Sequence, residues 1–112
     1  MTTINVPNRD EVSPANQTIF DNLEKRLGFV PNLYATFAHS ANALASYLAL
    51  QGARSSLDAR AREVISLVVS QVNGCEYCLA AHTVLGKVNG FTDEQILEIR
   101  RGRASFDAKL RL

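Results

Sequence analysis

The sequence predicts an all-α fold, and three observations support that prediction. Apolar residues recur at the three- and four-residue spacing of a helix, and no segment alternates as a strand does. Cap and stop residues divide the chain into segments of helical length. No internal repeat or low-complexity stretch interrupts them. A length of 112 residues suits a single domain, residues 1–112, with a core of its own.

The N-terminal half is expected to hold three helices after an extended polar arm. The first runs to about residue 27, the second is short, and the third is alanine-rich and runs to about residue 50. Proline at the first helical position and glycine after the last are typical of helix boundaries. The helix starts are marked, in order, by Ser13 with Pro14, by Pro31, and by Ser40 or Asn42.

The C-terminal half is expected to hold three more helices. Ser56 can cap the first, which would place Asp58 in its first turn. The run 61–72 is apolar on most sides, which predicts a central buried helix. Asn73 and Gly74 form a turn, and the next helix covers residue 75 to about 88. Thr92, three residues before a glutamine, opens a capping-box helix to about residue 101. The last ten residues carry no clear pattern.

Composition and charge exclude several classes of protein. The net charge is +1 and no Lys/Arg cluster is present, which argues against a nucleic-acid partner. No apolar run approaches the ~20 residues that span a bilayer, and the N-terminus lacks the apolar middle of a signal peptide. We therefore expect a soluble, cytoplasmic protein. In a reducing compartment, two cysteines three residues apart indicate redox or metal chemistry rather than a structural disulfide.

The two cysteines share a helix face with a histidine. Residues three and four apart on a helix lie on one side, so Cys75, Cys78 and His82 form a stripe. Cys75 also lies near the helix N-terminus, where unpaired N–H groups and the helix dipole favour the reactive thiolate. His82 lies one turn beyond Cys78 and can accept or return a proton.

Glu63 is predicted to meet this stripe from the preceding helix. If the two helices are antiparallel, Glu63 lies roughly 15 Å before the turn and His82 roughly 12 Å after it, at 1.5 Å per residue. The carboxylate would then fix the imidazole tautomer and raise its basicity. An acidic residue at the edge of an otherwise apolar helix also needs such a role.

Other interpretations of the same residues stay open. A zinc site could use both cysteines and His82 with Glu63 or His39, but the spacing is unlike the usual zinc knuckle. The cysteines could be small buried apolar groups, and His82 a satisfied core histidine. Glu63 could pair with a neighbouring arginine, Arg60 or Arg62. Covalent haem is excluded because leucine follows the second cysteine.

The arrangement Glu63-x11-Cys75-x2-Cys78-x3-His82 resembles the signature of the AhpD-like alkylhydroperoxidases, within the carboxymuconolactone decarboxylase superfamily. The resemblance covers roughly residues 25–105. It is carried by the segments 28–33, 59–65, 72–83 and 90–94.

The resemblance implies a compact helical bundle whose central antiparallel helix pair carries the motif. It implies reduction of hydroperoxides without a cofactor or metal. Cys78 would attack the peroxide, Cys75 would resolve the sulfenic acid, and a dithiol donor would reset the pair, with Glu63 and His82 as the proton relay. It also implies a homo-oligomer, a trimer or a hexamer.

Two departures from the family pattern stand out. Tyr77 occupies the position where the best-studied members have histidine, and a phenol with pKa ~10 is no base near neutral pH. It can still donate a hydrogen bond, and the tyrosine form resembles a shorter peroxidase-related subgroup. Relatives also continue with further helices, so this chain is expected to be naturally short or truncated at Leu112, and partner chains would then cover the surface that those helices cover in relatives.

Two other functions compete with peroxide reduction: lactone decarboxylation, and a non-catalytic redox or metal-binding oligomer. The decarboxylases lack the cysteine pair, which counts against the first.

Overall fold

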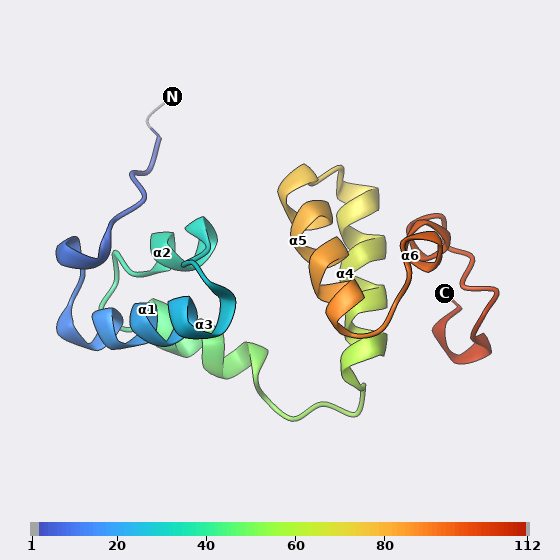
Figure 1. Cartoon of the computed structure of the whole chain (residues 1–112), viewed down its shortest axis with the longest axis horizontal. Coiled ribbons are helices and arrows are strands. Elements are labelled where there is room, and N and C mark those ends of the chain that lie inside the picture. Colours follow the sequence, from blue (N-terminus) through green and yellow to red (C-terminus); the bar gives the residue numbers. More distant parts are fainter. Residues whose placement is uncertain (1–2, 112) are drawn as a thin grey trace. The chain divides into compact units, whose positions relative to one another are not determined.

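The computed structural model describes residues 3–111, and all of their regular structure is helical (Figure 1). The predicted all-α fold is confirmed. The chain forms two compact units, residues 1–54 and 55–112. The single-domain prediction stays a prediction. Among the described residues, no helix is both long and apolar enough to cross a bilayer.

The first unit contains three α-helices after a short 3-10 turn. They are α1 (Pro14–Leu27), α2 (Asn32–Phe37) and α3 (Ala43–Gln51), with η1 (Arg9–Glu11) before them. The Ser13 hydroxyl accepts a hydrogen bond from the N–H of Asn16, so the predicted start of α1 is confirmed. Gly28 ends α1 at a φ of 83°, a conformation that glycine adopts without strain. The unit has its own core, formed by Val12, Phe20, Ala35, Ala38 and Leu44.

Polar and aromatic contacts tie the helices of the first unit together. Asn16 is buried, and its amide donates to the carbonyl oxygens of Ala38 and Ser40. The Phe37 and Tyr47 rings stack with centroids 4.6 Å apart, which joins α2 to α3. These contacts join the helices of the first unit, although several of its large apolar side chains, Phe29 and Leu50 among them, are exposed.

The second unit is built on an antiparallel helix pair. Helices α4 (Ala59–Asn73) and α5 (Glu76–Val88) lie side by side, and α6 (Asp93–Arg100) packs against both (Figure 1). The predicted turn is present, with Gly74 at a φ of 64°. The predicted capping box at Thr92 is also present. The core of this unit is formed by Val64, Leu67, Phe91, Ile96, Ile99, Ala104 and Leu110.

Two predictions for α4 are wrong. Its cap is Asp58, whose carboxylate accepts from the N–H of Ala61, and not Ser56. A carboxylate at the cap position accepts a hydrogen bond from an otherwise unpaired N–H and also suits the positive end of the helix. The helix is also not buried on most sides within this unit, since α5 and α6 cover one side and leave the other open. The exposed apolar residues of α4 are Ile65, Val69 and Val72.

Close packing fixes the second unit around α5. Gly86 is buried, and a Cβ at that position would lie 3.3 Å from the Ile96 side chain, so glycine lets α6 approach α5. Arg60 of α4 lies 4.1 Å from the centroid of the Phe91 ring and donates to the Asn89 carbonyl oxygen at 3.0 Å. The start of α4 is therefore joined to the end of α5. This pair forms the frame that holds the candidate site.

Candidate redox site

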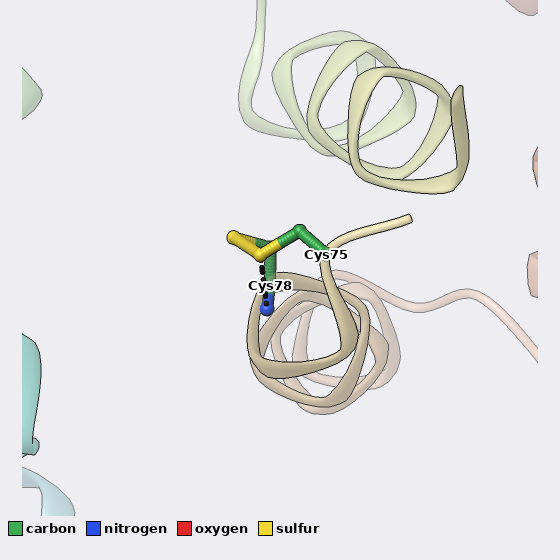
Figure 2. Close-up of a disulfide and its surroundings, with 2 residues drawn as sticks. All are labelled: Cys75 and Cys78. Atoms are coloured by element: carbon green, nitrogen blue, oxygen red, sulfur yellow. Dashed lines mark hydrogen bonds between the residues drawn. A yellow bond between two sulfur atoms is a disulfide. The ribbon is translucent and has the colours of Figure 1, made fainter. Parts of the chain in front are cut away.

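The two cysteines are joined by a disulfide at the start of α5 (Figure 2). Their Cα atoms are 5.3 Å apart, and both residues are partly exposed. Cys75 is the N-cap residue of α5, one position before its first helical residue. Its Sγ accepts a hydrogen bond from the backbone N–H of Cys78 at 3.2 Å, drawn as the dashed line in Figure 2. The pair therefore lies where the helix offers unpaired donors and positive potential.

Glu63 and His82 meet across the helix pair, as the distances from the turn predict. A carboxylate oxygen of Glu63 lies 2.7 Å from Nδ1 of His82. The side chains are 14% and 28% exposed, respectively, so the contact is partly shielded from water. Since a carboxylate accepts, Nδ1–H donates, which leaves Nε2 free to exchange a proton. A hydrogen bond of this kind, from the imidazole to a carboxylate, fixes the orientation and the tautomer of a catalytic histidine.

One of the two arginines considered as partners for Glu63, Arg60, is occupied elsewhere. Arg60 lies over the Phe91 ring and binds the Asn89 carbonyl oxygen, and does not pair with Glu63. Glu63 is placed by its position on α4, next to Val64, whose side chain enters the core. A partly buried carboxylate that accepts from an imidazole is a satisfied polar group with a defined geometry.

The disulfide and the Glu63–His82 pair occupy consecutive turns of α5. Cys78 and His82 are four residues apart, about 6 Å of helix rise, and on one face. Tyr77 is 51% exposed at the second position of the helix. The four predicted residues thus form two bonded pairs, the Cys75–Cys78 disulfide and the Glu63–His82 hydrogen bond. Among the described residues, no hydrogen bond links His82 to the disulfide.

The remaining candidate, His39, belongs to the first unit. Its Nε2 donates to the Asn5 carbonyl oxygen, which ties the N-terminal arm to the residues after α2. Within the described part of the chain, no group of three or more His, Cys, Asp or Glu side chains is arranged to hold a metal ion.

The sequence did not predict the role of Arg60 in joining α4 to the end of α5. The only indication of that role was its position, about one turn before Glu63.

The model of the carboxymuconolactone decarboxylase family matches residues 31–111. The chain belongs to the carboxymuconolactone decarboxylase family. The matched region contains both cysteines, the histidine and the glutamate of the site. No curated protein and no solved structure matches the chain. This arrangement is suited to two-electron thiol chemistry, because two cysteines that can form a disulfide lie about one helical turn from a histidine that can carry a proton.

Proposed function

We propose that this chain is a thiol-dependent peroxidase that reduces alkyl hydroperoxides through a Cys75–Cys78 dithiol–disulfide cycle. The observation that carries the proposal is the disulfide on the same helix face as a histidine held by a carboxylate. A structural disulfide needs no proton carrier beside it. A peroxidase does, because its reaction moves protons at two steps.

The oxidative half of the cycle begins at Cys78. Its thiolate attacks one oxygen of the hydroperoxide, the O–O bond breaks, and an alcohol leaves after protonation from the His82 imidazolium. Cys78 becomes a sulfenic acid. The Cys75 thiolate then attacks the Cys78 sulfur, the S–O bond breaks, and water leaves with a second proton. Glu63 holds the imidazole so that Nε2 serves both transfers.

The reductive half needs a small or protein dithiol donor, which supplies two electrons and regenerates both thiols. We propose that no cofactor takes part and that the reaction occurs in the cytoplasm. We also propose a homo-oligomer, a trimer or a hexamer. The proposed assembly is supported by large apolar side chains that are exposed on the helix pair, including Val72 at 80% and Val88 at 77%.

Tyr77 is proposed as an auxiliary group. It is half exposed and directly precedes Cys78 in the sequence, so its hydroxyl is available to donate a hydrogen bond to bound peroxide. Lactone decarboxylation, the reaction in the family's description, gives no role to a paired dithiol. A redox-sensing or metal-holding module would use the cysteines without turnover, so a turnover assay separates it from an enzyme.

The test is peroxide-dependent consumption of a dithiol by the parent protein and four variants. Cys78→Ser is expected to abolish turnover, and Cys75→Ser to stop it after one sulfenic acid is formed. Glu76→Gln is the matched control, since it alters an exposed residue between the cysteines and should leave the rate unchanged. Equal activity in the double cysteine-to-serine variant would exclude a thiol peroxidase. Stoichiometric zinc in the reduced protein, without turnover, would favour the metal-binding module.

A further inference from the structure

The two sulfur atoms of the disulfide have different surroundings. Cys75 Sγ accepts the Cys78 N–H at 3.2 Å and lies at the N-terminus of a 13-residue helix. Cys78 is the third residue of that helix, and among residues 3–111 no hydrogen bond reaches its sulfur. The disulfide is therefore polarised by its position. Negative charge is stabilised on the Cys75 sulfur and is not stabilised to the same degree on the Cys78 sulfur.

Thiol–disulfide exchange is sensitive to this difference. The attacking thiolate forms a bond to one sulfur, and the other sulfur leaves with the electron pair, so the better-stabilised thiolate leaves faster. A hydrogen bond already directed at the leaving sulfur needs no rearrangement as the charge develops. The neighbouring carboxylate, Glu76, is exposed, and solvent screens its repulsion.

We infer that the dithiol donor attacks Sγ of Cys78 and that Cys75 leaves as the thiolate. This inference rests on the proposed function, because it names the reductive step of the same site. One donor thiolate forms a mixed disulfide with Cys78 as the Cys75–Cys78 bond breaks. The second donor thiolate then attacks the donor sulfur of that mixed disulfide. The donor closes to its own disulfide, and Cys78 is released as a thiolate. Two electrons pass to the protein, and the two protons of the donor pass to solvent or to the new thiolates.

If the donor attacks Cys78, the two cysteines have different roles in the cycle. Cys78 forms bonds with both external substrates, the peroxide and the donor. Cys75 bonds only to Cys78 and spends the rest of the cycle as a stabilised thiolate. Such a thiolate is available for attack as soon as the sulfenic acid forms.

The experiment is trapping of the mixed disulfide in the oxidised, full-length parent protein. The probe is N-acetylcysteine, a monothiol, so that the second step cannot follow. Early time points are quenched with iodoacetamide, which alkylates whichever cysteine was released. Cleavage after glutamate separates residues 64–76 from residues 77–94, so each cysteine is found in its own peptide. No peroxide is present, so the outcome is independent of whether the protein turns over peroxide.

We expect the N-acetylcysteine adduct on Cys78 to exceed that on Cys75 by about tenfold, in line with the strength of a charge-assisted hydrogen bond. An excess on Cys75, equal amounts on both, or a disulfide that the thiol does not open would overturn the inference. As a second measurement, the pH midpoint of iodoacetamide alkylation is compared in Cys78→Ser and Cys75→Ser. The first variant keeps the backbone N–H that faces Cys75, and we expect its midpoint to be the lower. The reverse order would also overturn the inference.

Discussion

Replacement of Glu63 by glutamine is the sharpest test of the proton relay. The substitution keeps the size of the side chain and an oxygen that can accept from His82, but it removes the charge. The two atoms are 2.7 Å apart, and the carboxylate is 14% exposed, so solvent compensates little for the loss. We expect Glu63→Gln to slow peroxide reduction without unfolding the protein.

The magnitude follows from the type of hydrogen bond. A bond to a charged group contributes about 1.5–3 kcal/mol, and a neutral one about half of that, so the variant loses about 0.8–1.5 kcal/mol. If this stabilisation is needed when the imidazole becomes charged, kcat/KM falls by about four- to twelvefold. The assay is the initial rate at low hydroperoxide concentration with the dithiol donor in excess.

The control is Glu76→Gln, which removes a carboxylate of the same kind from the exposed start of α5. Its kcat/KM should stay within about twofold of the parent, as expected for a surface charge. Thermal unfolding of both variants shows whether any loss reflects the fold. The relay is refuted by an unchanged rate in Glu63→Gln, or by an equal loss in the control.

Three further predictions concern stability and electrostatics. Leu67→Ala removes a fully buried side chain of the second core and should lower the free energy of unfolding by about 2–5 kcal/mol in urea titrations. Gly90→Ala places a Cβ at a φ of +91° and 3.1 Å from the Arg60 guanidinium, whereas Gly102→Ala, at +72°, meets open space. Both should cost about 1–2 kcal/mol of backbone strain, with the larger loss of Tm for Gly90→Ala. The hydrogen bond from the Arg9 guanidinium holds the pKa of the Asp21 carboxyl below its ordinary value of 3.8. The stability that this pair provides is therefore complete above pH 3.8 and is lost as the pH falls through the lower folded-state pKa. NMR titration of Asp21 in the parent checks the direction of the pKa shift, and urea unfolding of the parent and Asp21→Asn at several pH values checks the loss of stability, which added salt should weaken.

Local chemistry made most helix boundaries predictable. The hydroxyls of Ser13 and Thr92 cap α1 and α6 through neighbours only three residues away, so the sequence alone carries the information. The same holds for the turn at Gly74. The cap of α4 was mistaken because Ser56 and Asp58 are both good cap residues, and the choice between them depends on where the packed helix begins.

Packing across the chain was less predictable. The apolar run of α4 is equally compatible with a buried helix and with one that leaves Val69 and Val72 exposed within its unit. The pattern shows that these residues are apolar but not what covers them. The burial of Ala104 and Leu110 in the second core had no signal, because a tail whose regular structure is one 3-10 turn, η2 (Ala108–Leu110), is too short to show a period.

The candidate site was predictable where spacing decides geometry. Helix periodicity places Cys78 and His82 on one face, with Cys75 at the cap just before the helix, and the Glu63–His82 contact follows from similar distances to one turn. The hydrogen bond to the Cys75 sulfur was not predicted, since it depends on the backbone angles of a single cap residue.

The most direct test of the central claim is a peroxide titration of the reduced protein, followed by mass analysis of each point. If the cysteines form a peroxide-reducing pair, one equivalent of an alkyl hydroperoxide converts each chain to a form lighter by two hydrogens. Fragmentation then places a disulfide between Cys75 and Cys78, and a dithiol reverses the change. A protein that keeps both thiols through several equivalents of peroxide, or that gains oxygen without forming the disulfide, would contradict the account.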